Sequence, residues 1–137
     1  MSTRWLFKTE PSVYSYQQLV KDKKTMWDGV ANNLALKNLK DIKKGDPILI
    51  YHTGDERQAV GVARALGGAY TDPSKSNPKL LVVDIEPVKP LAKPVTLAEV
   101  KANKKLANFD LVRISRLSIM KVTDEQWEIM EGMAKAK

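Results

Sequence analysis

The sequence contains no cysteine and only one histidine, His52. Disulfide bonds, cysteine-ligated zinc and thiol nucleophiles are therefore excluded. A single histidine leaves carboxylates and carbonyls as the other possible metal ligands. The acidic residues Asp55, Glu56 and Asp72 fall in predicted loops, where we expect them to be solvated. We therefore expect no metal site and no cofactor.

Long apolar runs are also missing. No stretch approaches the roughly 18 to 20 uninterrupted apolar residues that a membrane helix requires. Residues 1–5 lack the apolar segment of a signal peptide and resemble the start of a strand. We therefore expect no membrane association and a cytoplasmic location. A glycine-rich phosphate loop is absent as well, since Gly67-Gly68 alone indicates only a bend.

A serine hydrolase triad is not indicated either. Such a triad would have to use His52, with Ser115 or Ser118 as the nucleophile. Nothing in the sequence resembles a nucleophile elbow or an oxyanion-stabilising pair of glycines. We therefore interpret His52 as a partly buried, hydrogen-bonding residue at the end of a strand.

Basic residues outnumber acidic ones, with 23 Lys and Arg against 16 Asp and Glu, and the formal net charge is +7. Such a charge accelerates association with polyanions and favours nucleic acid as a partner. The alternative is that the lysines are simply solvated. With 137 residues the chain is expected to form one domain, 1–137, whose core needs no disulfide or metal.

The most informative stretch runs from Trp27 to Val62. A Gly-Asp-Pro turn leads into an apolar run that ends at Tyr51 and His52, and a polar loop then leads to a second run at 59–63. Apolar runs of this length between turn residues predict buried strands. We expect this hairpin to form the wall of a barrel, with Trp27, Tyr51 and His52 at the mouth of a pocket.

Periodicity and capping signals predict the remaining elements. Strands are expected at 4–9, 80–85 and 111–120, and helices at 16–21, 32–42, 97–101 and from Thr123 onward. Loops are expected at 21–24 and 70–78, and Pro87, Pro90 and Pro94 indicate an edge strand or an extended crossing. Strands in the middle with helices at the connections predict an α+β fold.

Aromatic residues on different elements alternate with basic and polar ones. The aromatic set is Trp5, Phe7, Tyr14, Trp27 and Tyr51, and the polar set is Lys8, Asn32, His52, Arg113 and Arg116. Aromatic faces stack on bases at about 1–3 kcal/mol each, and basic side chains hold phosphates. Core packing is the alternative for each aromatic. Trp27 is the strongest candidate for binding, because it stands beside the Asp28-Gly29 turn.

Several blocks of this sequence resemble the EVE domain family. They are Trp5-Leu6-Phe7-Lys8-Thr9-Glu10-Pro11-Ser12 with Tyr14, Trp27-Asp28-Gly29-Val30 with Asn32, Gly45-Asp46, Tyr51-His52-Thr53, Val60-Gly61, Tyr70-Thr71-Asp72-Pro73 and Ser115-Arg116-Leu117-Ser118-Ile119. The resemblance implies a PUA-like fold, a mixed β-barrel flanked by short helices and related to the YTH domain. It also implies a non-catalytic reader with a pocket for a modified base. That base would be methylated or hydroxymethylated cytosine in DNA, or a modified base in RNA.

The resemblance also implies where the site residues lie. It places seven residues in or beside the pocket: Trp27, Asn32, Tyr51, His52, Ser115, Tyr14 and Ser12. In this interpretation Trp27 stacks on the base, and Asn32 and His52 bind its edge. Lys8, Arg113 and Arg116 would hold the flanking phosphates.

One departure from the family and two alternative functions remain open. Family members often carry arginine and other polar residues after Gly29-Val30, whereas this chain has Ala31, Leu34 and Leu36, which removes potential phosphate contacts. The first alternative is an enzyme acting on a nucleotide or RNA, with His52 as general acid or base. The second is a small-ligand sensor or a protein-interaction module in which the positive charge is incidental.

Overall fold

One curled mixed sheet organises the chain in this computed structural model, which describes residues 3–30, 32–74, 76–77, 79–114 and 116–135. The strand order is β2-β6-β4-β3-β1-β7, with β5 paired to β6 outside this path. The strands are β1 (Arg4–Thr9), β2 (Thr25–Trp27), β3 (Pro47–His52), β4 (Gln58–Ala65), β5 (Tyr70–Thr71), β6 (Leu81–Thr96) and β7 (Ile119–Val122). Among the described strands only β1 and β3 are parallel. The order ends at β2 and β7, so the sheet is a half-barrel.

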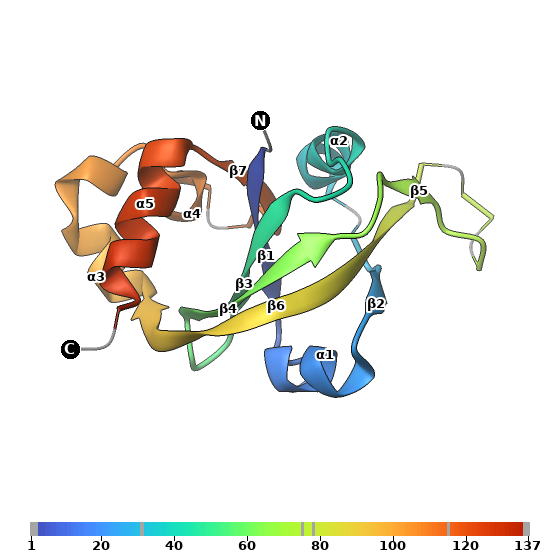
Figure 1. The fold of residues 1–137 in the computed structure, drawn as a ribbon. Coiled ribbons are helices and arrows are strands. Elements are labelled where there is room, and N and C mark those ends of the chain that lie inside the picture. The colour runs from blue at the N-terminus through green and yellow to red at the C-terminus, as the bar shows by residue number, and fades with distance from the viewer. Residues whose placement is uncertain (1–2, 31, 75, 78, 115, 136–137) are drawn as a thin grey trace.

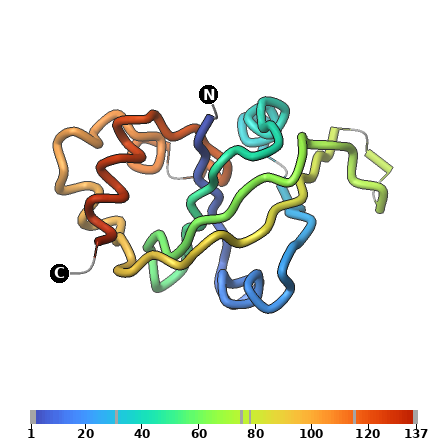
Figure 2. The backbone as a smooth tube through the Cα atoms, in the orientation of Figure 1, coloured from blue at the N-terminus to red at the C-terminus, as the bar shows by residue number. Residues whose placement is uncertain are grey.

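Short helices flank the sheet, as the α+β prediction requires. They are α1 (Tyr16–Asp22), α2 (Asn33–Lys40), α3 (Leu97–Ala102), the 3-10 turn η1 (Lys104–Leu106), α4 (Asp110–Arg113) and α5 (Asp124–Met133). Figure 1 shows α3, α4 and α5 gathered at one end of the sheet. The tube in Figure 2 runs from β1 through α1 into β2, which places α1 and β2 toward the other end. No described helix has the length and apolarity to cross a membrane.

The core is centred on β1. Trp5, Leu6 and Phe7 are all fully buried, because β1 is covered on both faces. The indole Nε1–H of Trp5 donates a hydrogen bond to Asp46 Oδ2 at 2.9 Å, and the backbone N–H of Lys43 donates to the same oxygen at 3.0 Å. Asp46 is itself buried, and these bonds satisfy its Oδ2 atom. Core packing is therefore the role of Trp5.

The capping signals are confirmed at the helix starts. Thr96 with Glu99, and Thr123 with Gln126, form complete capping boxes at the starts of α3 and α5. Ser15 caps α1 by accepting a bond from the backbone N–H of Gln18. The Gln18 side chain, however, donates to Asp22 Oδ1 at 2.9 Å and does not return to the cap. The predicted loop at 21–24 was wrong at its start, because α1 continues through Asp22.

The largest error concerns 111–120, which was predicted to be extended. Residues 110–113 form α4, and the strand begins only at Ile119. Phe109, Leu111 and Leu117 are buried, and their even spacing is compatible with an extended strand, so alternation alone did not reveal the helical turn. The short strands β2 and β5 were also missed, because two or three residues carry too little periodicity to be recognised.

The prolines of β6 do not end the strand. Pro87 and Pro90 face Ala63 and Gly61 of β4 near two register shifts, where a missing N–H is tolerated. In the described residues, β6 beyond Ile85 pairs with β4 alone. The expected edge character of this proline-rich segment is therefore confirmed.

Candidate nucleic-acid interface

A cavity of about 550 Å³ opens between the end of β1, the turn that follows it, and β2. Its lining residues are Lys8, Thr9, Glu10, Val13, Tyr14, Thr25, Met26, Trp27, Asp28 and Gly29. We call it the aromatic cavity. The curl of the sheet creates it, because β1 and β2 are not neighbours in the strand order and yet Phe7 and Trp27 are in contact.

Trp27 is held between two other rings. Its centroid lies 5.4 Å from that of Phe7 in a tilted arrangement and 6.1 Å from that of Tyr14 edge-on. Both are favourable aromatic geometries. Only 8% of Trp27 is exposed, and the ring contributes to the wall of the cavity. Trp27 is therefore both a core residue and a cavity residue. It is the last residue of β2.

Tyr14 is fixed on the turn after β1. The backbone N–H of Tyr14 donates to the carbonyl of Glu10 at 2.9 Å, and its carbonyl accepts from Thr9 Oγ1 at 2.7 Å. Its hydroxyl donates to Asp22 Oδ2 at 2.8 Å. Burial raises the pKa of the Tyr14 hydroxyl, so this group keeps its proton at neutral pH. The ring is therefore preorganised beside Trp27.

A second cavity, of about 210 Å³, shares Lys8 with the first. Its lining residues are Lys8, Tyr51, Thr53, Gly54, Arg57, Leu97, Lys101, Leu111 and Val112. We call it the cation cavity. The Lys8 ammonium lies 5.9 Å from the centroid of the Tyr51 ring. Burial lowers the pKa of Lys8, and burial also raises the pKa of Tyr51 against the opposing effect of Arg57.

Comparison with known proteins identifies the family. The model of the EVE domain matches residues 3–133. The chain belongs to the EVE domain family. A solved protein from Rhodopseudomonas palustris is 40% identical, with 96% of this chain and 92% of that chain covered and a TM-score of 0.91. The human THYN1 protein, solved in complex with 5-methylcytosine-containing DNA, is 29% identical over 99% of each chain, with a TM-score of 0.89.

The PUA-like fold expected from the sequence is confirmed as well. The YTH domain of Zygosaccharomyces rouxii MRB1, solved with N6-methyladenosine RNA, has a TM-score of 0.61 over 98% of this chain and 88% of that domain. Its sequence is only 15% identical, so it supports the fold alone. This EVE domain is thus a curled mixed half-barrel with short flanking helices.

The structure brings three of the expected site residues together at the aromatic cavity, namely Trp27, Tyr14 and Lys8. Tyr51 lies in the cation cavity instead. Ser12 is exposed, and its hydroxyl donates to Glu10 Oε1 at 3.3 Å next to the aromatic cavity. Ser115 lies outside the described residues.

His52 has a structural position in this EVE domain. It is 1% exposed and lies outside the lining of both cavities. Its Nε2 accepts from the backbone N–H of Tyr16 at 3.0 Å, and its Nδ1 lies 2.9 Å from Glu56 Oε1. An accepting Nε2 places the ring proton on Nδ1, which donates to Glu56. Both nitrogens are thus engaged within the fold.

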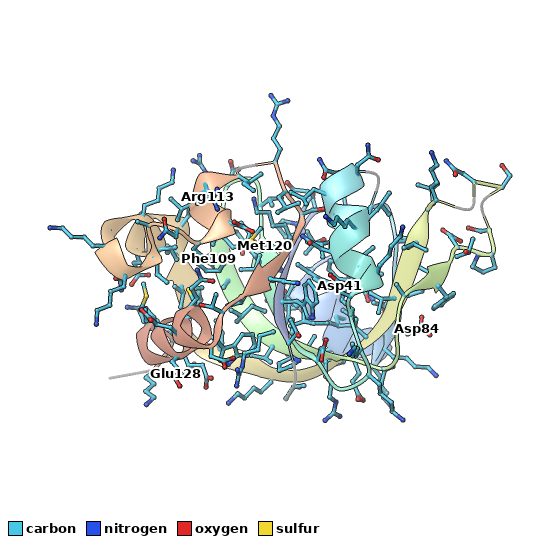
Figure 3. All side chains as sticks on the ribbon, turned by 90° about the horizontal axis from the view of Figure 1, so that it is seen from above. Asp41, Asp84, Phe109, Arg113, Met120 and Glu128 are labelled. Carbon is cyan, nitrogen blue, oxygen red and sulfur yellow. The ribbon has the colours of Figure 1, made fainter. Side chains whose placement is uncertain are left out.

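The lining of the aromatic cavity does not include Asn32, Arg113 or Arg116. The Asn32 side chain accepts from the backbone N–H of Ala35 at 3.0 Å and caps α2. Arg113 forms an exposed ion pair with Asp110 at 3.2 Å. Figure 3 shows Arg113 far from Asp84, the register partner of Met26 on β2. Arg116 is exposed.

Four charged residues that line the cavities had not been assigned to the site from the sequence: Glu10, Asp28, Arg57 and Lys101. Glu10 directly follows the predicted strand at 4–9, and that position was an available signal. Asp28 follows β2, which was not recognised in the sequence. Arg57 and Lys101 come from a loop and from α3, and only the folded chain brings them to Lys8.

Proposed function

We propose that this EVE domain is a non-catalytic reader that binds a modified base of a nucleic acid in the aromatic cavity. The observation that carries the proposal is the position of Trp27, which is braced by Phe7 and Tyr14 and lines a cavity of about 550 Å³. The human THYN1 protein in complex with 5-methylcytosine-containing DNA supports it. A reader rather than an enzyme is supported by His52, whose two ring nitrogens are engaged within the fold.

The chemistry of the lining suits 5-methylcytosine. The base offers a flat face, an exocyclic amino donor and a methyl group. Trp27 and Tyr14 provide aromatic surface, and Met26 and Val13 provide apolar contacts for the methyl group. Asp28 provides an exposed carboxylate that accepts no hydrogen bond among the described residues. Carboxylates accept from the N4 amino group of cytosine, so Asp28 is the residue that we assign to the base edge.

The base must leave its stack to enter the cavity, at a cost of a few kcal/mol that is lowest for single strands. Basic residues would hold the flanking phosphates without reading sequence. Lys8 is placed for this role because it lines the cavity. Arg116, exposed on the surface, would contribute only to general attraction. Its replacement by alanine should therefore weaken binding to all sequences equally.

The proposal is tested by titrating the protein with short oligonucleotides that differ in one base. Cytosine, 5-methylcytosine, 5-hydroxymethylcytosine and N6-methyladenine would each be tested in single- and double-stranded DNA and in RNA, at two salt concentrations. A saturable preference for one modified base is expected. Salt-sensitive binding that ignores the modification would leave only a basic surface and would contradict the reader function.

Asp28→Ala should reduce the preference for 5-methylcytosine over thymine by about tenfold, or about 1.4 kcal/mol. Both bases carry the C5 methyl group, but thymine presents a carbonyl oxygen where 5-methylcytosine presents the amino donor. The measurement is a competition titration of two oligonucleotides that differ only in this base. Because a ratio is measured, the change in net charge cancels.

Glu128→Ala is the matched control for Asp28→Ala. Glu128 is exposed on α5, and Figure 3 shows it at the opposite end of the molecule from Asp84 and hence from β2. This variant removes the same charge and should keep the full preference. An Asp28→Ala protein that also keeps it would exclude Asp28 as the amino acceptor.

A further inference from the structure

Three basic side chains from separate parts of the fold line the cation cavity. Lys8 comes from β1, Arg57 from the loop between β3 and β4, and Lys101 from α3. None of the described residues that line this cavity is acidic. Like charges gathered at one cavity repel one another, so this arrangement favours an anion as the occupant.

Two carboxylates lie near this cavity: Glu10 is close to Gly54 of the lining, and Asp55 lines a neighbouring cavity together with Arg57 and Lys101. The described ion pairs of arginine are Arg4 with Asp124, Arg64 with Glu86 and Arg113 with Asp110. Among the described residues, neither Arg57 nor Lys101 has a carboxylate within ion-pair distance. Glu56, which precedes Arg57, is directed to His52 at 2.9 Å. The Glu56 carboxylate, the nearest to Arg57 in sequence, therefore pairs with His52 and not with Arg57.

The backbone at Arg57 is fixed in an unusual conformation. Its φ is +45°, in the left-handed region that side chains other than those of asparagine and aspartate rarely adopt. Its carbonyl accepts from the backbone N–H of Leu97 at 2.8 Å, and its Nε donates to the carbonyl of Gly54 at 3.3 Å. Strained residues that the surrounding structure holds in place are concentrated at ligand sites.

The walls of the cation cavity strengthen its electrostatics. Leu97, Leu111 and Val112 contribute apolar surface, and the Tyr51 ring lies beside the Lys8 ammonium. Apolar walls lower the local dielectric and increase the attraction between the cations and a bound anion. An anion would also offset the burial that disfavours the charged form of Lys8.

We propose that the cation cavity is a phosphate site that holds the strand whose modified base occupies the aromatic cavity. Lys8 lines both cavities and connects them. The occupant is a phosphate group of the nucleotide next to the bound base. This inference rests on the proposed function for its choice of nucleic acid, and the chemistry of the site itself requires only a phosphate.

Lys101→Gln tests the site, with Lys105→Gln as the matched control. Both lysines are exposed, both variants remove one positive charge, and Lys105 belongs to η1 and lies outside the cavity lining. Affinity for a single-stranded oligonucleotide with one 5-methylcytosine would be measured over a range of salt concentrations. Lys101→Gln should weaken binding about three- to tenfold more than Lys105→Gln. It should also lower the salt slope by about 0.7 more, the loss of one phosphate contact.

A second experiment uses inorganic phosphate alone, followed by NMR of the backbone amides. Saturable shifts at Gly54, Arg57 and Lys101 are expected in the wild type, and they should vanish in the double variant Arg57→Asn, Lys101→Gln. Asparagine is chosen because it tolerates the left-handed backbone of position 57. This readout is independent of any binding to a base.

The two experiments separate this inference from the reader function. Phosphate binding without any binding of modified oligonucleotides would support the anion site and contradict the reader. The anion site would be overturned if Lys101→Gln and Lys105→Gln had equal affinities and phosphate caused no shifts. A preference for modified bases in the same experiments would leave the reader function intact. Phosphate shifts with equal oligonucleotide affinities would identify free phosphate as the ligand and overturn its assignment to the strand.

Discussion

Trp27→Ala is expected to abolish the preference for a modified base and to lower the free energy of unfolding by about 3–5 kcal/mol. The indole is 8% exposed and packs on Phe7 and Tyr14, so its removal leaves a cavity in the core. The same removal takes away the stacking surface of the aromatic cavity. Denaturant unfolding measures the first effect, and paired titrations with methylated and unmethylated oligonucleotides at low temperature measure the second.

Trp127→Ala separates these two effects. Trp127 is 5% exposed on α5 and lies outside the lining of the aromatic cavity. Its truncation should cost a similar amount of stability and leave the base preference unchanged. If both variants lose the preference together, general destabilisation explains the loss. If Trp27→Ala keeps the preference, Trp27 does not bind the base.

Gly61→Ala is expected to destabilise the fold by about 3 kcal/mol. A Cβ atom at position 61 would lie 2.4 Å from the Tyr16 ring, closer than any normal contact. Tyr16 cannot easily move away from position 61, because it is held at two points. Its hydroxyl donates to the carbonyl of Val62 at 2.9 Å, and its backbone N–H donates to His52 Nε2 at 3.0 Å. Thermal or denaturant unfolding of the variant measures the effect.

A double-mutant cycle tests the cause of the Gly61→Ala effect. In a Tyr16→Leu background the clash with the ring is gone, so Gly61→Ala should cost much less than in the wild type. The coupling between the two positions should therefore be at least about 1 kcal/mol. Strictly additive effects would show that the close approach to Tyr16 does not determine the choice of glycine.

The fold was predictable where local signals agree with burial. The aromatic alternation of β1, the turn before β3 and the two threonine capping boxes led to correct elements. The sequence signals predicted the wrong element where tertiary packing outweighs the local preference of the residues. The run at 111–120 contains β-branched residues typical of a strand, but Leu111 reaches the core from the one-turn helix α4.

The site was only partly predictable for a related reason. Tyr14, Trp27 and Lys8 are recognisable from their residue types, and Trp27 also from its place beside the Asp28-Gly29 turn. The burial and hydrogen bonding of His52 at the end of β3 agree with its interpretation from the sequence, but its partners Tyr16 and Glu56 could not be named without the folded chain. Arg57 and Lys101 reach the cation cavity only because β4 and the start of α3 are joined by backbone pairing.

The most direct test of the aromatic cavity is an NMR titration that follows the three indole N–H signals with an oligonucleotide containing 5-methylcytosine. Trp5 donates to Asp46 in the core, and Trp127 lies on α5, so both serve as internal controls. The Trp27 signal should shift saturably, with little change in the other two. A second basic groove, lined in part by Lys37, Lys40 and Lys79, provides the contrasting outcome. Shifts of the backbone amides of these lysines, followed in the same titration, with an unchanged Trp27 signal would contradict recognition of the base at the aromatic cavity.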